Sequence, residues 1–327
     1  MGRISDHILS ANDIDSFRNW SVTYPSLPIT GTYTCVASNG TTFVLAGSAL
    51  PLRSTNGTTW VAASNQPIYE MFGICSKGTT NEFMAIGNAE FAWKSTDSGN
   101  TWTSASIASS AVLSGMRCIA SNGARYVCVG SNFNVIANKS IAATSTNGTT
   151  WTTSTLPFSG NNAIWRSIAS NGTNFVAAGN CDLGICLAVT SDGTTWIGIL
   201  PGGFPFVLQG TPTVSSNGSR YVVIANNIAF SDNAGTTWTI LQNQSFQGNA
   251  GNWLTADGSR FLCTALSNYA LVSENGLIYR TKPISLQASG TWLYSCSNGP
   301  SYVLNNGPYI FVDYLFGTSK VARIAAI

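Results

Sequence analysis

The chain has 327 residues, of which only 9% are Asp, Glu, Lys or Arg, and its formal net charge is +2. So few and scattered charges exclude recognition of nucleic acid or of an anionic membrane surface by bulk electrostatics. No apolar run approaches the roughly 20 residues that span a bilayer, so we expect no membrane insertion. Gly, Ser, Thr and Asn supply the polarity instead, which favours strands joined by tight turns over long surface helices.

The N-terminal region has two parts. Residues 1–16 are polar, lack the apolar stretch of a secretory signal, and are interpreted as a tail or docking segment. The next stretch, "FRNWSVTYPSLP" (17–28), resembles "GTTWTTSTLP" (148–157) further along the chain, including the final Leu-Pro. We therefore expect 17–28 to form the same kind of strand as the residues after Trp151.

A repeated unit follows, in which an apolar strand, an Asn-Gly type of turn and a second apolar strand succeed one another. It occurs seven times, from "TCVASNGTTFVLAG" (34–47) to "LYSCSNGPSYVLNN" (293–306). The turn glycines are Gly40, Gly78, Gly123, Gly172, Gly218, Gly258 and Gly299. Their spacing, 38 to 49 residues, is typical of propeller blades or of a solenoid.

Each of the first six units continues with a third strand, a second polar turn and a fourth strand. In five of them the fourth strand begins at a tryptophan, as in "STNGTTW" (54–60 and 145–151), whereas the sixth reads "SENGLIYR" with Tyr279 in its place. Four short strands in about forty residues describe one blade of a β-propeller. The predicted fold is all-β: a single seven-bladed propeller of four-stranded antiparallel blades over 17–327. Expected blade bounds are 30–63, 70–105, 115–155, 164–200, 210–241, 251–282, and 291–327 together with 17–28.

The last unit carries no tryptophan turn, and "YIFVDYL" (309–315) is its candidate third strand. We expect the N-terminal strand to complete this blade and close the ring, which removes the free sheet edges at the seam.

The pattern Ser/Thr-x-Asp/Asn-x-Gly-x-Thr-Trp resembles the Asp box, or BNR repeat, of sialidase-like β-propellers. Its residues are predicted to be structural: Asn56, Trp60, Asp97, Trp102, Asn147, Trp151, Asp192, Trp196, Asp232 and Trp238. Asp and Asn interchange at the second polar position, which suits a hydrogen-bonding turn better than a metal site. No metal and no cofactor are expected.

The resemblance raises the question of catalysis. Sialidases use three arginines, a Tyr–Glu nucleophile pair and an acid, and the sequence has no "F/Y-R-I-P" segment near its start. Its single histidine, His7, lies in the tail, and a carboxylate pair of the glycosidase kind would have to come from residues such as Glu70, Glu90 and Asp182. The sequence analysis therefore predicts a protein that is not an enzyme, with a glycoside hydrolase or a lectin-like propeller as the alternative.

A binding surface is expected on the face opposite the tryptophan turns, where the connecting loops vary while the turns repeat. Aromatic and basic residues gather there: Phe72, Arg117, Trp165, Arg166, Phe204, Phe206, Phe246, Trp253 and Trp292. On the turn face, Arg125, Arg220 and Arg260 are solvated turn residues or an anion-binding arc.

The Thr/Asn/Gly-rich style resembles propellers of bacteriophage virion and tail proteins. The resulting hypothesis is a virion component that contacts a host surface glycan or a neighbouring virion protein, with an extracellular location and a homo-oligomer left open. Of the eight cysteines most lie in apolar segments, and a Cys181–Cys186 disulfide across a hairpin is left open.

Overall fold

The computed structural model describes residues 20–326, except 66, 68–69, 88–90, 108–114, 133–138, 160–161, 201–211, 226, 242–252, 257–259, 265–268, 274, 278–279, 284–290, 293–308 and 316–317. These residues form an all-β structure of four-stranded antiparallel sheets. The expected tail, residues 1–16, lies outside them. None of the described elements is a helix able to cross a membrane.

Four consecutive strands form each of six sheets. Sheet 1 contains β2 (Tyr33–Ser38), β3 (Phe43–Gly47), β4 (Leu52–Ser54) and β5 (Val61–Ala62). Sheet 2 contains β6 (Met71–Ser76), β7 (Phe83–Gly87), β8 (Phe91–Ser95) and β9 (Thr103–Ser106). Sheet 3 contains β10 (Met116–Ser121), β11 (Tyr126–Asn132), β12 (Lys139–Ser145) and β13 (Thr152–Thr155). Sheet 4 contains β14 (Ile164–Ser170), β15 (Phe175–Cys181), β16 (Gly184–Thr190) and β17 (Ile197–Ile199). Sheet 5 contains β18 (Thr213–Ser216), β19 (Tyr221–Ile224), β20 (Ile228–Ser231) and β21 (Thr239–Ile240). Sheet 6 contains β22 (Trp253–Ala256), β23 (Phe261–Thr264), β24 (Tyr269–Ser273) and β25 (Arg280–Pro283).

A further sheet, sheet 7, joins the two ends of the chain. Its strands run in the order β26 (Thr291–Trp292), β27 (Tyr309–Leu315), β28 (Thr318–Ala326) and β1 (Trp20–Thr23). Trp20 pairs with Ala326, and Thr23 with Arg323. "YIFVDYL" is therefore the second strand of its sheet and not the third. It pairs along its whole length with β28, a strand that has no counterpart in the repeat pattern and that the sequence analysis missed. The expected first two strands of this copy, within 293–306, lie outside the described residues.

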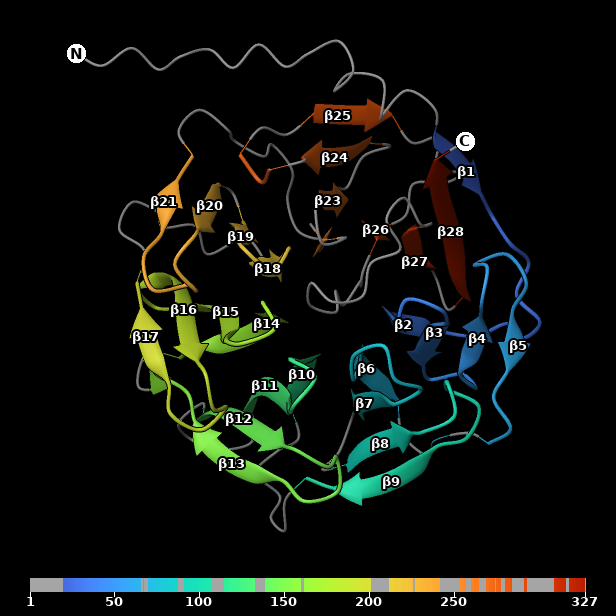
Figure 1. Cartoon of the computed structure of the whole chain (residues 1–327), viewed down its shortest axis with the longest axis horizontal. Coiled ribbons are helices and arrows are strands. Elements are labelled where there is room, and N and C mark those ends of the chain that lie inside the picture. The colour runs from blue at the N-terminus through green and yellow to red at the C-terminus, as the bar shows by residue number, and fades with distance from the viewer. Residues whose placement is uncertain are drawn as a thin grey trace.

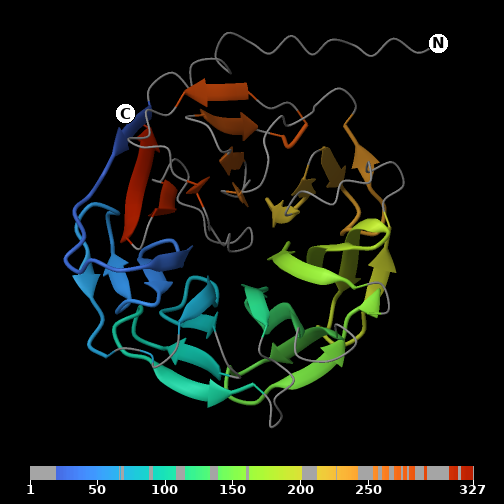
Figure 2. The ribbon, with the colours of Figure 1, turned by 180° about the vertical axis from the view of Figure 1, so that it is seen from behind.

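The sheets are arranged around a common centre (Figures 1 and 2). The first strand of each sheet lies nearest the centre and the fourth at the periphery (Figure 1). First strands contact one another from β2 through β6, β10, β14 and β18 to β22, and β2 also contacts β27 of sheet 7.

The core lies between the sheets. One buried cluster joins sheets 3 and 4 through Val129, Leu156, Trp165 and Phe175, and similar clusters join sheets 1 and 2, 2 and 3, 4 and 5, and 5 and 6. A single four-stranded sheet cannot bury both its faces, so its apolar strands "FVLAG" or "YVVI" are buried only by stacking against neighbours. This arrangement fixes the inner edges of the sheets as a rigid frame for side chains near the centre.

Candidate functional site

Each of the tryptophan turns (54–60, 95–102, 145–151, 190–196 and 231–238) is organised by one side-chain oxygen. Asn147 Oδ1 accepts hydrogen bonds from the backbone N–H groups of Thr149 at 2.9 Å and Thr150 at 2.8 Å. Asp192 Oδ1 accepts the equivalent bonds from the two following threonines at 2.8 and 2.7 Å. Because these bonds use an oxygen that both side chains have, Asp and Asn can interchange. The geometry is that of a turn and not of a metal site.

The hydrogen bonds also set the electrostatics of the turn carboxylates. Burial acts to raise the pKa of Asp192, but the N–H groups of Thr195 and Thr194 and the hydroxyl of Thr190 outweigh it and hold that pKa well below its usual range. The pKa of Asp97 is likewise lowered, since hydrogen bonds from Thr101 and its neighbours outweigh its desolvation.

The turn in sheet 5 differs from the sequence prediction. Asn233, and not Asp232, accepts the bonds from Ser231 at 2.9 Å and from the N–H of Thr237 at 2.9 Å. Asp232 instead accepts two bonds from Arg220, at 2.5 and 2.7 Å, and this pairing lowers the pKa of Asp232. The longer turns at 95–102 and 231–238 hold one extra residue. Counting two residues forward from the Ser or Thr that begins the turn identifies the accepting residue in every turn.

The turns connect each sheet to the one before it. Gly148 has a φ of +76°, and a Cβ there would lie 2.2 Å from Met84 Cε of sheet 2. Gly99, Gly193, Gly235 and Gly276 approach the preceding sheet in the same way. The indole N–H of Trp151 donates to the carbonyl of Gly148 at 3.3 Å. The tryptophan turns are therefore inter-sheet contacts.

Cationic side chains complete these contacts. Lys94 Nζ donates to the carbonyl of Asn147 at 2.7 Å, Arg125 donates to that of Asp192, and Arg220 to that of Asn275, each on the next sheet. Arg125 and Arg220 are thus committed to holding neighbouring sheets and do not form an anion-binding arc. Arg260, the third of these arginines, is partly buried just before β23.

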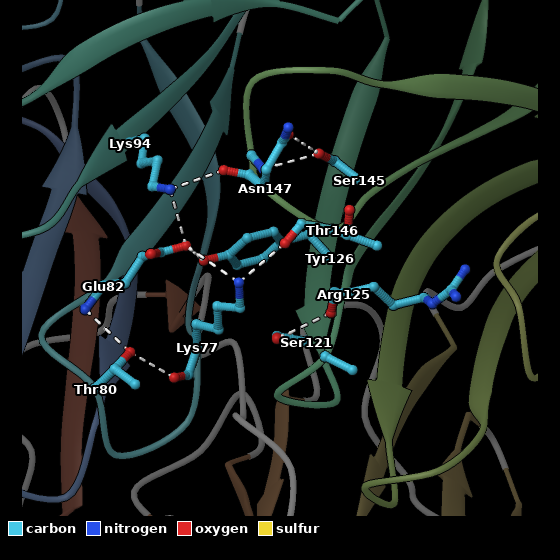
Figure 3. A network of polar contacts seen from close by, with 12 residues as sticks. Lys77, Thr80, Glu82, Lys94, Ser121, Arg125, Tyr126, Ser145, Thr146 and Asn147 are labelled. Carbon is cyan, nitrogen blue, oxygen red and sulfur yellow. Dashed lines mark hydrogen bonds and ion pairs between the residues drawn. The ribbon is translucent and has the colours of Figure 1, made fainter.

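The densest of these polar contacts surrounds Glu82, between sheets 2 and 3 (Figure 3). Lys94 Nζ and Lys77 Nζ lie 3.2 and 3.7 Å from its Oε1, and the hydroxyl of Tyr126 donates to the same oxygen. Burial raises the pKa of Tyr126. A Tyr–Glu pair invites comparison with a nucleophile, but the equivalent Tyr221 donates to the carbonyl of Asn174 at 2.6 Å in the same position of sheet 5. Both tyrosines connect sheets, and Tyr126 is fully buried.

The opposite end of the first strands has a different local structure. In β2, β6, β10 and β14 the pairing with the second strand skips one residue, a β-bulge. The skipped residues are Thr34, Phe72, Arg117 and Arg166.

In each second strand a glycine pairs with the residue that precedes the bulge. A Cβ on Gly130 would lie 2.2 Å from the carbonyl oxygen of Gly115, and one on Gly179 would lie 2.5 Å from that of Ile164. Real Cβ atoms do not approach backbone so closely, so only glycine permits the bulged strand to pass here. The same holds for Gly47 and Gly87.

Two arginines stand at neighbouring bulges. Arg117 and Arg166 are exposed on β10 and β14, and Phe72 is half-buried on β6. The guanidinium carbon of Arg117 lies 5.2 Å from the centroid of the Phe72 ring, a cation–π contact that orients it. Within the described part of the chain, no ion pair joins Arg117 to a carboxylate. We call Phe72, Arg117 and Arg166 the inner-edge site. It combines two cations with an aromatic surface.

The other predicted binding residues have different outcomes. Trp165 is fully buried between sheets 3 and 4 and is a core residue, contrary to its predicted place on a binding face. Its equivalents Tyr33, Met71 and Met116 are buried too, and their shared apolar character was the signal. Trp253 begins β22 and Trp292 ends β26. Phe204, Phe206 and Phe246 lie outside the described residues.

Among the residues that the structure describes, the candidate carboxylates and cysteines form no recognisable catalytic group. Asp182 is exposed and accepts a bond from Asn162 at 2.9 Å, Glu70 is partly buried, and Glu90 lies outside the described residues. Cys181 and Cys186 are buried free thiols, and burial raises the pKa of Cys186. Among the described residues, no group of three or more His, Cys, Asp or Glu side chains is placed to hold a metal ion.

No protein-family model and no curated protein matches the sequence. Solved structures do match. A YCF48 bound to a D1 peptide has a TM-score of 0.63 and 16% identity, with 95% of this chain and 98% of that chain covered. A streptogramin B lyase has a TM-score of 0.69 and 11% identity, with 96% and 100% covered. YCF48 from Cyanidioschyzon merolae has a TM-score of 0.61 and 13% identity, with 94% and 99% covered.

These neighbours also correct one prediction. The sequence analysis predicted a protein that is not an enzyme, and this is contradicted by a neighbour that is named as a lyase. The missing sialidase residues exclude one chemistry only, and the fold itself accommodates others. At these identities the likeness shows the fold alone. The protein has a β-propeller fold like that of YCF48 and streptogramin B lyase.

Proposed function

We propose that the chain is a seven-bladed propeller that binds a segment of a partner protein at the inner-edge site. The blade count is supported by the seven sheets formed by the described residues. Closure by the N-terminal strand is supported by the pairing of β1 with β28, and by the contact of β2 with β27. The hydrogen bonds of the tryptophan turns support their identification with the Asp box.

The observation that carries the binding role is Arg117 held over Phe72 beside an exposed Arg166. The three side chains occupy equivalent bulges in the first strands of neighbouring sheets. The backbone conformation is therefore the same at the three positions, while the side chains differ. Variable side chains on a rigid repeated frame are the usual way in which propellers carry recognition. Paired guanidinium groups suit a carboxylate, and an aromatic plane suits an apolar side chain beside it.

A structural neighbour supports the choice of a protein partner. One YCF48 structure has a D1 peptide bound, so this fold can hold a polypeptide segment. No neighbour reported above supports a bacteriophage particle or a host glycan, and the proposal includes neither. It retains from the sequence analysis only a binding role on the face opposite the turns.

The test uses an array of synthetic peptides of equal length that differ in acidic content and in having a free or amidated C-terminus. The purified chain is expected to retain acidic peptides. The Arg117→Ala/Arg166→Ala variant should lose at least about a hundredfold in affinity, since two charge-assisted contacts of roughly 1.5–3 kcal/mol each are removed. Retention should also weaken as salt is raised.

The matched control is Arg125→Ala/Arg220→Ala, which removes the same charge from the turn face. It should bind the peptides as the parent does, provided that circular dichroism shows it folded. Equal loss of binding in both double variants would point to bulk charge, and unchanged binding by Arg117→Ala/Arg166→Ala would reject the site.

A further inference from the structure

The residue of the second strand that stands opposite the bulge position is a glycine in sheets 1 to 4 and an alanine in sheets 5 and 6. Sheets 1 to 4 each have a bulge in the first strand and, in the second strand, a glycine paired with the residue before the bulge. In sheet 5 the described pairing begins at Thr213 opposite Ile224, one residue after the position of the bulge, and Ala225 stands in place of the glycine. In sheet 6 the described pairing begins at Trp253 opposite Thr264, and the sequence has Ala265 in place of the glycine.

The bulge determines where the side chain goes. In a regular strand, successive side chains point to alternate faces, and both faces of these first strands are packed against neighbouring sheets. A skipped residue leaves this alternation, so Arg117 and Arg166 are exposed while the residues on either side, Met116 and Cys118 in β10, are buried. At the aligned position of sheet 5, Pro212 is buried.

We propose that a ligand contacts one side of the ring only, along the inner edges of sheets 2 to 4 with sheet 1 at the boundary, and that the glycine opposite each bulge is the positioning residue that maintains the bulge. This rests on the proposed function for the nature of the ligand. The four bulge residues run from Thr34 and Phe72 to Arg117 and Arg166. The surface therefore fits an extended polypeptide segment that carries an acidic group next to an apolar side chain.

The contacts at each position support this order. Thr34 is buried and its hydroxyl donates to the carbonyl of Met71 at 2.5 Å, so sheet 1 bounds the surface with a satisfied polar group. Phe72 contacts Arg117 and places an apolar plane directly beside the first cation. Arg166 then extends the positive charge to sheet 4.

A thiol-labelling experiment tests the positioning without any ligand. The seven described native cysteines are buried, so the parent chain supplies the background. Arg117→Cys should react rapidly with a maleimide reagent in the folded protein. Adding Gly130→Ala should slow labelling several-fold, because an added Cβ cannot coexist with the bulge and residue 117 returns to the packed ladder. Pro212→Cys in sheet 5 should remain protected.

The controls separate position from stability. Gly148→Ala adds a methyl group to a turn glycine with a close inter-sheet contact, and should lower stability without changing the labelling of Arg117→Cys. Gly179→Ala with Arg166→Cys repeats the test one sheet further on, in case Gly130→Ala does not fold. Rapid labelling of Arg117→Cys in the Gly130→Ala background, or of Pro212→Cys, would overturn the inference.

Peptide binding then distinguishes the two proposals. Gly130→Ala should reduce retention of acidic peptides as Arg117→Ala does, while Gly148→Ala should not. If Arg117→Ala/Arg166→Ala loses binding but Gly130→Ala keeps both labelling and binding, the positioning inference fails and the proposed function stands. If Gly130→Ala slows labelling while Arg117→Ala/Arg166→Ala still binds, the glycine positions the bulge but the proposed function fails.

Discussion

One oxygen atom explains the variation within the tryptophan turns. Asn147 and Asp192 accept equivalent bonds through Oδ1, so their carboxylate or amide identity matters little for geometry. It matters for charge. A carboxylate that accepts backbone N–H bonds is stabilised in its ionised form, and its contribution to stability therefore depends on pH.

The first prediction concerns this pH dependence. The pKa of Asp192 is lowered in the folded chain, so its stabilising effect is complete above the unfolded value of about 3.9 and is lost as pH falls through the folded value. Asp192→Asn should reduce the free energy of unfolding at neutral pH and make it less dependent on pH below about 5. Urea unfolding at a series of pH values measures both effects.

The reciprocal variant is the control. Asn147→Asp keeps the same acceptor and should make stability more sensitive to acid, with little change of structure. If both variants showed the parent's pH dependence, the turn bonds would not be the cause of the lowered pKa.

At this scale the sequence predicted the role of the turns but not every residue. Asp232 was chosen because it is acidic, whereas its distance from Ser231, the residue that begins the turn, identifies Asn233. Trp165 was assigned to the surface because aromatic residues often bind ligands. Its alignment with Tyr33 and Met71, both fully buried, indicated the core.

At the scale of the element, the strands follow from the sequence more completely than their irregularities do. Apolar runs and Asn-Gly turns predicted the first three strands of sheets 1 to 5. The bulges could not be read from apolar alternation, since they depend on contact between two strands. The glycines at 47, 87, 130 and 179 were visible as a repeat, but their meaning needed the approach of the opposite backbone.

The second prediction concerns a hydrogen bond between strands of two neighbouring sheets. Tyr126 begins β11 and its hydroxyl donates to Glu82, the residue before β7 in the preceding sheet (Figure 3). Tyr126→Phe removes one donor from a partly buried carboxylate and should destabilise the fold by about 1–3 kcal/mol. Thermal and urea unfolding measure the loss.

Glu82→Gln tests whether the effect passes through this pair. If it does, adding Tyr126→Phe to Glu82→Gln should cost less than Tyr126→Phe alone. Additive losses would show that the two side chains act separately.

At the scale of the whole molecule, the two ends of the chain meet in sheet 7. Strand β1 supplies the outermost position, beside β28. The similarity of 17–28 to 148–157 predicted an N-terminal strand at the outer position of the last sheet, but not that its partner is β28. Which segments form the strands of sheet 7 was not predictable, because no tryptophan turn marks the position of β28. This strand instead forms a long antiparallel pair with β27.

The third prediction concerns this seam. Removing residues 1–23 deletes β1 and exposes the edge of β28, so the melting temperature should fall and aggregation should increase. Removing residues 1–19 retains β1 and is the matched control. Similar melting temperatures for both truncations would contradict closure by β1.

Many of the contacts between neighbouring sheets are formed by residues that recur in each repeated unit. A turn glycine rests on the preceding sheet, and a basic side chain reaches forward to the backbone carbonyl of the next turn. A backbone carbonyl is present whatever the side chain, so the contact does not depend on the residue that the next turn carries. Each unit therefore has a basic side chain for the following unit and a turn that packs on the preceding one. A duplicated unit would carry the groups for both of these inter-sheet contacts. Blade number can therefore change by tandem duplication without new complementary surfaces having to arise, while the few inner-edge positions remain free to diversify.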